Sequence, residues 1–117
     1  MSRKSIIIDD DEDLCEVLAE TLSDLGFEVD IALDAGTGRQ FLKKYSYDLI
    51  LLDLKLPGDG FSILRKIDSA ELNSRLFIIT GNPINNLPKY KRNLLDKAED
   101  VFIKPFPMTD FLKKIKR

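Results

Sequence analysis

The sequence has no histidine, only one cysteine and no long apolar run, and each shortage removes a class of function. Without histidine the chain can build neither a Ser-His-Asp nor a Cys-His catalytic group, and it has no histidine ligand for zinc and no residue for phosphohistidine storage. Cys15 cannot form an intrachain disulfide, which suits a reducing compartment. Any chemistry must therefore use carboxylates, hydroxyls, lysines or a hard metal ion.

Signals for membranes, secretion and nucleic acid are also missing. No apolar run approaches the ~18 residues of a membrane span. The first residues, Met1 to Lys4, lead directly into a short expected strand and not into a secretory signal. The net charge is −2, which gives no reason to expect general binding to nucleic acid. We therefore expect a cytoplasmic protein that binds neither membranes nor nucleic acid directly.

The length and composition are those of one globular domain. The 117 residues leave no room for two domains, and 44% apolar with 32% charged residues is ordinary for a protein with one core. Neither an internal repeat nor a linker interrupts the chain. We therefore treat residues 1–117 as a single domain.

Short apolar runs alternate with helical patterns along the whole chain. Because such alternation requires crossover connections, it predicts an α/β fold with a doubly wound, five-stranded parallel sheet and helices on both faces. The least regular stretch is 81–91, whose prolines and asparagines predict a delayed or irregular fourth helix; Pro83, Asn85, Asn86 and Pro88 lie there. The expected strands are 5–8, 27–32, 47–52, 76–79 and 101–103.

Polar residues follow the expected strands at their carboxyl ends, which is where open parallel sheets bind ligands. Asp9 and Asp10 follow the first strand, Asp53 the third, Thr80 the fourth and Lys104 the fifth. Because the first and third strands are neighbours in a doubly wound sheet, three carboxylates should meet at one edge. Such a cluster of oxygen ligands suits Mg²⁺, and Mn²⁺ would fit the same ligands.

These five side chains could together carry out phosphoryl transfer. A carboxylate beside Mg²⁺ can act as a nucleophile without a general base and form an aspartyl phosphate. Phosphoryl transfer is mainly a matter of alignment and charge neutralisation. Lys104 could supply an ammonium group and Thr80 a hydroxyl donor.

Four segments of the chain resemble the signature segments of response regulator receiver domains. They occur in the family's order with similar spacing, and the resemblance covers nearly the whole chain. It implies a flavodoxin-like strand order 2-1-3-4-5 and a phosphoprotein of a two-component system that switches a protein-interaction surface and is not a turnover enzyme. The segments are Ile6–Asp13, Tyr47–Gly58, Ile78–Thr80 and Phe102–Phe106.

The resemblance also implies a role for each residue of the metal site. Asp53 matches the phosphoacceptor, which also contacts the metal. Asp10 matches the direct metal ligand, and Asp9 matches the acid that usually reaches the metal through water. Lys55 matches the position whose backbone carbonyl completes the site.

Further residues are implied to contact the phosphoryl group. Thr80 matches the switch hydroxyl, and Lys104 matches the cation that pairs with the phosphate. A cis peptide bond is common in the family before the residue that matches Pro105. The phosphodonor implied by the resemblance is a histidine kinase or a histidine phosphotransfer protein.

The chain departs from the family pattern in several places, two of which bear on its function. The loop that contains Gly58 is one residue shorter than usual. Val101 stands where the family usually has a switch aromatic, and Phe102 lies one residue later. These departures favour an alternative, in which the chain is a receiver-like interaction module that works without phosphorylation.

A second alternative is a phosphohydrolase that uses Asp9 and Asp11 after its first strand. That class needs a cap or a larger core and further acids late in the chain. This chain is too short for it, and Asp53 would have no role.

Overall fold

The computed structural model describes residues 3–69, 73–81 and 87–116. Strands and helices alternate through these ranges, as predicted from the sequence. Within them, no helix has both the length and the apolar character needed to cross a membrane. In chain order the elements are β1 (Arg3–Ile8), α1 (Glu12–Asp24), β2 (Phe27–Ala32), α2 (Ala35–Lys44), β3 (Leu49–Asp53), α3 (Gly60–Ser69), β4 (Arg75–Thr80), α4 (Lys89–Leu95), β5 (Asp100–Ile103) and α5 (Met108–Ile115).

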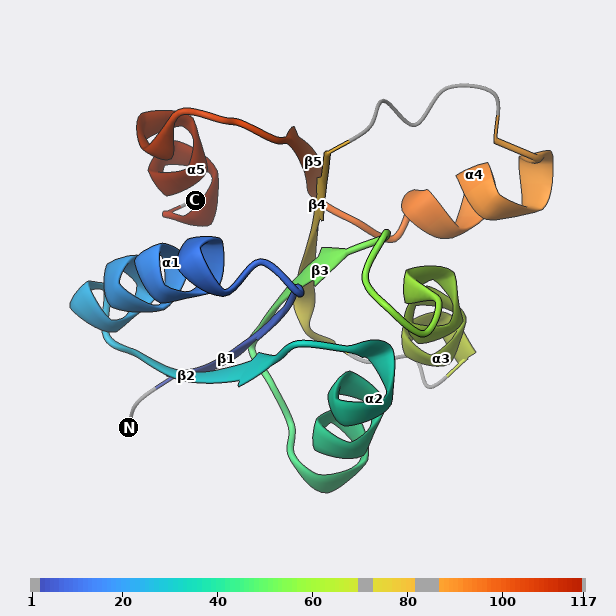
Figure 1. The fold of residues 1–117 in the computed structure, drawn as a ribbon, viewed down its shortest axis with the longest axis horizontal. Helices are drawn as coiled ribbons and strands as arrows, with labels where there is room; N and C mark the ends of the chain where they lie inside the picture. Colours follow the sequence, from blue (N-terminus) through green and yellow to red (C-terminus); the bar gives the residue numbers. More distant parts are fainter. Residues whose placement is uncertain (1–2, 70–72, 82–86, 117) are drawn as a thin grey trace.

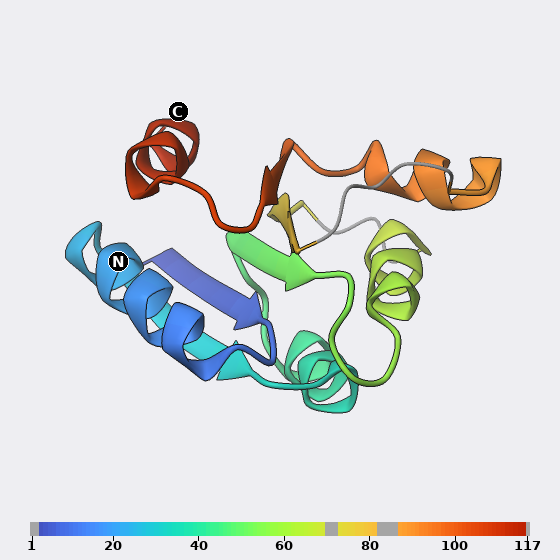
Figure 2. The same ribbon diagram turned by 45° about the horizontal axis from the view of Figure 1, so that its top comes forward.

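The strands form one parallel sheet in the order β2-β1-β3-β4-β5, which confirms the predicted topology. Helices α1 and α5 cover one face, and α2, α3 and α4 cover the other (Figures 1 and 2). Each face has its own apolar cluster, and every residue of β3 is buried. Because β3 lies in the middle of the sheet between two layers of helices, its last residue is held rigidly at the carboxyl edge.

Carboxylates fix the starts of the first two helices. Asp11 accepts a hydrogen bond from the backbone N–H of Leu14 at 3.1 Å, which makes it the N-cap of α1. Asp34, the N-cap of α2, accepts one from the N–H of Thr37 at 2.7 Å. This bond to Thr37 lowers the pKa of Asp34. Each cap satisfies an N–H group that has no partner within its helix.

Some strand boundaries differ from the prediction. β1 begins at Arg3, two residues earlier than expected, because Arg3 and Lys4 pair in register with the start of β2. β3 begins at Leu49, not at Tyr47. Before it, the N–H of Asp48 donates to the carbonyl of Lys4 at 2.8 Å, and the N–H of Lys4 donates to the Asp48 side chain at 2.8 Å. These bonds lie outside the regular ladder of the sheet. The apolar content of the sequence alone does not reveal where that ladder begins.

The fourth helix is short and begins late, as its sequence predicted. α4 has seven residues, its N-cap Pro88 makes no side-chain capping bond, and none of its residues is buried. Of the residues behind that prediction, Pro83, Asn85 and Asn86 lie outside the described residues. The Nζ of Lys91 lies 4.8 Å from the centre of the Phe61 ring of α3.

Arg75 ties the beginning of β4 to two later elements. Its guanidinium contacts both carboxylate oxygens of Glu99, at 2.7 and 3.1 Å. The same group donates to the carbonyls of Lys114 and Ile115 in the last turn of α5, at 3.1 and 2.8 Å. Arg75 thereby satisfies carbonyls that a helix end leaves without partners.

The connection from β3 to α3 is a tight turn beside the end of β3. Gly58 and Asp59 both have positive φ, at 92° and 73°. Gly60 lies so close to the preceding backbone that an added Cβ would stand 2.7 Å from the Leu54 carbonyl oxygen and 2.8 Å from that of Asp53. Only glycine fits there without moving the backbone that carries Asp53.

We therefore expect Gly60→Ala to destabilise the protein by about 1–3 kcal/mol, because the new methyl group overlaps with backbone that cannot rotate away. Gly36→Ala is the matched control, since its Cβ would meet only a side-chain oxygen of Asp34, at 3.4 Å. That change should be neutral or stabilise by up to about 1 kcal/mol. Urea unfolding followed by circular dichroism measures both, and equal stability of the two variants would contradict the packing described.

Candidate phosphoacceptor site

The predicted site residues lie together at the carboxyl edge of the sheet. Asp53 is the last residue of β3 and Thr80 the last of β4, while Asp9 and Lys104 directly follow β1 and β5. Lys104 is held beside Thr80 because its N–H donates to the Thr80 carbonyl at 2.8 Å. Asp10 follows Asp9 and is exposed. Strand order alone therefore brings these five residues to one edge.

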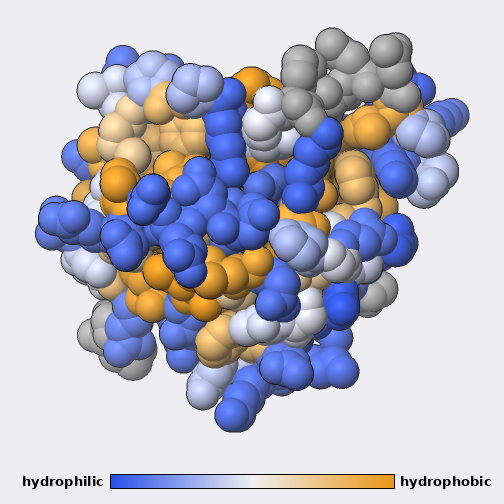
Figure 3. Space-filling view, in the orientation of Figure 1, coloured by the Kyte–Doolittle hydropathy of each residue, from blue (hydrophilic) through white to orange (hydrophobic). Residues whose placement is uncertain are grey.

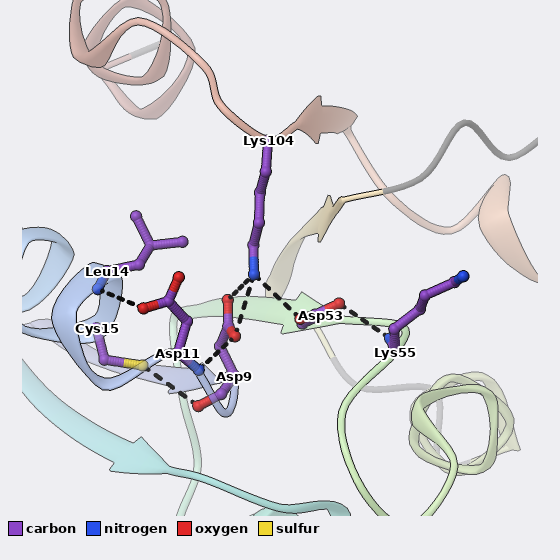
Figure 4. A network of polar contacts seen from close by, with 7 residues as sticks. All are labelled: Asp9, Asp11, Leu14, Cys15, Asp53, Lys55 and Lys104. Atoms are coloured by element: carbon purple, nitrogen blue, oxygen red, sulfur yellow. Dashed lines mark hydrogen bonds and ion pairs between the residues drawn. The ribbon is translucent and has the colours of Figure 1, made fainter.

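The Lys104 ammonium group lies between two carboxylates (Figure 4). Its Nζ is 3.1 Å from Oδ2 of Asp53 and 2.9 Å from Oδ2 of Asp9. Burial would lower the pKa of Lys104, but the bonds to Asp9 and Asp53 outweigh burial and raise the pKa above its usual value. Lys104 is thus a cation at the site and not a proton donor.

Asp9 is completely buried although it carries a carboxylate. Its Oδ1 accepts a hydrogen bond from the N–H of Asp11 at 3.0 Å and a longer one from Lys104 at 3.2 Å. Oδ2 is in contact with the ammonium but has no hydrogen bond of good geometry among the described residues. Burial, followed by the nearby charge of Asp53, raises the pKa of Asp9 to about 6.

A cation site is formed by Asp9, Asp10 and Asp53. One carboxylate oxygen of each lies within 4.8 Å of the others. Asp9, whose Oδ2 atom lacks a hydrogen bond among the described residues, is part of this group, and oxygen ligands from carboxylates are those that Mg²⁺ prefers. The side chains present therefore fit a hard divalent cation.

The other oxygen of Asp53 is held by the backbone. Oδ1 accepts a hydrogen bond from the N–H of Lys55 at 2.9 Å, and the Lys55 side chain points away from the carboxylate (Figure 4). This amide bond was not predicted from the sequence, which indicated only a carbonyl role for Lys55. A backbone amide leaves no signal in residue identity, so sequence reasoning could not have found it. With Oδ1 fixed in this way, Oδ2 faces Lys104.

Two neighbouring side chains complete the surroundings. Thr80 is 2% exposed, and its place at the end of β4 is the predicted one. Cys15 is buried, and its Sγ lies 3.4 Å from the Asp9 carbonyl oxygen. Burial, together with the charge of Asp9, raises the pKa of the Cys15 thiol to about 12. Cys15 is therefore a neutral packing residue and not a nucleophile.

A sequence profile of the response regulator receiver domain family matches residues 6–116. The chain is a response regulator receiver domain. It is a signalling module of two-component phosphorelays and not a turnover enzyme, and membership of the family implies a histidine kinase as partner.

Individual relatives agree with the family match. The transcriptional regulatory protein DltR of Streptococcus agalactiae serotype III (strain NEM316) is 31% identical over 113 residues, which are 95% of this chain and 49% of DltR. A CheY-like receiver domain protein from Methanospirillum hungatei JF-1 has a TM-score of 0.85 and 27% identity, covering 99% of this chain and 92% of that one. The BeF3-activated DrrB receiver domain has a TM-score of 0.82 and 26% identity, covering 100% and 97%. The chain spans about half the length of the curated relatives it matches.

In this receiver domain, Val101 and Phe102 of β5 face opposite sides of the sheet. Val101 packs against the cluster under α4, whereas Phe102 points to the opposite face, where α5 lies. There the Phe102 ring contacts those of Phe106 and Phe111, with centroids 5.1 and 5.4 Å apart. Side chains alternate across a strand, so a shift by one residue moves the aromatic group from one helix layer to the other. The peptide bond between Lys104 and Pro105 is cis, as the family resemblance implied.

The raised pKa of Asp9 predicts a dependence of stability on pH. Between pH 4 and 6 the folded, metal-free domain keeps a proton on Asp9 that the unfolded chain, with a pKa of 3.8, has released. Rising pH through this window therefore favours the unfolded state. We expect Asp9→Asn to lose this decrease in stability, while Asp13→Asn, at an exposed acid outside the site, should retain it.

Urea midpoints measured from pH 4 to 7 in the presence of a chelator test this expectation. The decisive quantity is the difference between each variant and the parent, because other carboxylates also titrate in this range. If Asp9→Asn and the parent have parallel pH profiles, the Asp9 carboxylate does not titrate in this window.

Proposed function

We propose that Asp53 accepts a phosphoryl group from a histidine kinase or a histidine phosphotransfer protein. The observation that carries this proposal is the Lys104 ammonium, which lies within 3.1 Å of Asp53 Oδ2 at the edge of an acidic cluster. A cation that is already paired with the nucleophilic oxygen can also pair with a phosphoryl group attached to it. Residues 1–117 would act in this transfer as a single receiver domain.

The cation in this proposal is Mg²⁺, with Mn²⁺ as a substitute. Asp9, Asp10 and Asp53 supply carboxylate oxygens, and Lys55 supplies its backbone carbonyl. When bound, the cation neutralises charge on the phosphoryl oxygens during transfer. The buried Asp9 Oδ2 atom supports this assignment, because it has the ion pair with Lys104 but no hydrogen bond among the described residues.

In the transfer step, Asp53 Oδ2 attacks the phosphorus and forms a new oxygen–phosphorus bond. The bond between phosphorus and the donor's histidine nitrogen breaks, and the imidazole leaves with the electron pair and takes up a proton from water. A carboxylate nucleophile has no proton to remove, so no general base is required. The backbone N–H of Lys55 keeps Oδ1 fixed, which leaves Oδ2 as the attacking atom.

After transfer, Lys104 and Thr80 would contact the phosphoryl oxygens. Lys104 must then give up part of its contact with Asp9, and the connection that follows β5 would move with it. We propose that this movement shifts a pre-existing equilibrium at the surface formed by α4 and β5. Thr80 and Lys104 are adjacent through their backbone bond, which supports a joint response.

A second candidate function is a receiver-like interaction module that works without phosphorylation. Val101 favours it, because this smaller residue under α4 replaces the aromatic side chain that the family resemblance implies for the switch. The ion pairs at Asp53 favour phosphorylation instead.

Intact mass after incubation with Mg²⁺ and phosphoramidate separates the two candidates. We expect the parent to gain the mass of one phosphoryl group and Asp53→Asn to gain none. Asp13→Asn, which removes an exposed acid of α1, should be phosphorylated like the parent. If the parent gains no phosphoryl group from phosphoramidate or from any histidine kinase, the interaction-module function is the correct one.

Lys104→Met should affect metal binding and phosphorylation in opposite directions. Removal of the ammonium group frees Asp9 and Asp53, so the Mg²⁺ affinity without phosphodonor should rise by about fivefold or more. Phosphoryl uptake should be slower, because the phosphoryl charge loses a partner. Titration calorimetry measures the first effect and intact mass over time the second. Lys113→Met, at an exposed lysine of α5, is the control, and a lower Mg²⁺ affinity in Lys104→Met would contradict the arrangement.

A further inference from the structure

Strand β2 is an edge strand whose outer side is uncovered. All six of its residues pair with β1, from Arg3 with Phe27 to Ile8 with Ala32. No other described strand pairs with β2, which lies at the end of the sheet (Figure 1). The strand has neither a proline nor a bulge in its register, so its outer edge is regular. Regular edges of this length can accept another strand.

Alternate residues of β2 direct their backbone groups outward. The N–H of Asp9 donates to the carbonyl of Ala32 at 3.0 Å, so the Ala32 carbonyl faces β1. In a parallel ladder, successive residues direct their backbone groups to opposite sides. Val29 and Ile31 therefore turn their N–H and C=O groups away from β1, toward the open edge.

The side chains on the α1 side of β2 form an apolar row that α1 covers only in part. The row begins at Phe27, which is 6% exposed, and ends at Ile31 and Leu33, which are each 37% exposed. A groove of about 260 Å³ lies between this exposed end and α1. Figure 3 shows a hydrophobic area below hydrophilic side chains on this side of the molecule.

Four acidic side chains lie around this edge, and one of them, Asp30, is already paired with Lys4 of β1 at 3.8 Å. Glu28 and Asp30 alternate with the apolar row and face the other side of the sheet. Glu12 and Glu16 of α1 line the groove, and no lysine or arginine does so in the part of the chain that the structure describes. An incoming strand would therefore meet aliphatic side chains on one face and, on the other, the exposed carboxylate of Glu28 beside the Lys4–Asp30 pair.

We propose that the β2 edge binds an extended segment of another protein in which aliphatic and basic residues alternate. Val29 and Ile31 supply the backbone hydrogen bonds, the row ending at Leu33 packs the aliphatic side chains, and Glu28 pairs with the basic ones. A second copy of this chain fits poorly, because two β2 edges would bring Glu28 and Asp30 next to the same acids. A helix fits poorly too, since it would leave the outward backbone groups without partners. The interaction requires no phosphorylation of Asp53.

The probe is a capped peptide of about seven residues in which lysine alternates with isoleucine or valine, matching the length of β2. Hydrogen–deuterium exchange, followed by NMR, reports on individual backbone N–H groups. At saturating peptide, exchange at Val29 and Ile31 should slow about tenfold or more as their amides become hydrogen-bonded. A peptide with glutamate in place of lysine should leave exchange at both positions unchanged.

Two variants separate the contributions of backbone and charge. Ile31→Pro removes an outward N–H that β1 does not use, so it should abolish peptide binding, while Ile31→Val keeps the N–H and should bind like the parent. Glu28→Lys should weaken binding of the lysine peptide about tenfold and allow the glutamate peptide to bind. Glu28→Lys alters an exposed side chain, so it tests the proposal even if Ile31→Pro fails to fold.

Several results would overturn the proposal. Failure of the lysine peptide to bind would mean that the acids only protect the edge from aggregation. Binding without slower exchange at Val29 and Ile31 would indicate a helix in the groove, and equal binding of the glutamate peptide would exclude charge complementarity. Sedimentation of the protein alone should show a monomer, and a dimer that Glu28→Lys disrupts would assign the edge to a second copy.

Discussion

The shared ion pair of Lys104 with Asp9 and Asp53 is the interaction on which the carboxyl edge of the sheet depends. Two carboxylates about 4 Å apart repel by about 4 kcal/mol at an effective dielectric constant near 20. Both side chains are almost completely buried, so water cannot relieve this repulsion, and burial, followed by the charge of Asp53, raises the pKa of Asp9. The ammonium group offsets part of the cost and also links β5 to β1 and β3 through side chains. Any cation that enters the acidic cluster changes how Lys104 divides its contacts.

The parallel sheet and the residues that form the site could be predicted from the sequence, because both follow from the order of strands and helices along the chain. Apolar runs that alternate with helices define a parallel sheet, and the residues after such runs must lie at one edge. The structure confirms the strand order, which the family resemblance implied, and the meeting of Asp9, Asp53 and Lys104. The backbone ladder sets the strand ends, so the early start of β1 and the late start of β3 were missed. Burial of Asp9 and the amide bond from Lys55 depend on atomic positions that residue types do not encode.

The position of one aromatic side chain along β5 decides which layer of helices its ring contacts. The sequence showed that Phe102 and not Val101 is aromatic, but not what the ring would contact. In the structure the ring joins Phe77, Phe106 and Phe111 between the sheet and α5, with the Phe77 and Phe102 centroids 5.8 Å apart. On the opposite face of β5, under α4, Val101 supplies an aliphatic side chain. The aromatic ring of β5 thus packs on the α5 side of the sheet, and α4 has no buried residue.

Arg75 gives α5 a mechanical asymmetry. Its guanidinium fastens the carbonyls of Lys114 and Ile115 at the amino edge of the sheet, while the opposite end of the helix follows Lys104 through a short connection. The last turn of α5 is therefore anchored to the sheet independently of Lys104. If Lys104 is displaced, we expect Met108, at the opposite end of the helix, to move more than this last turn.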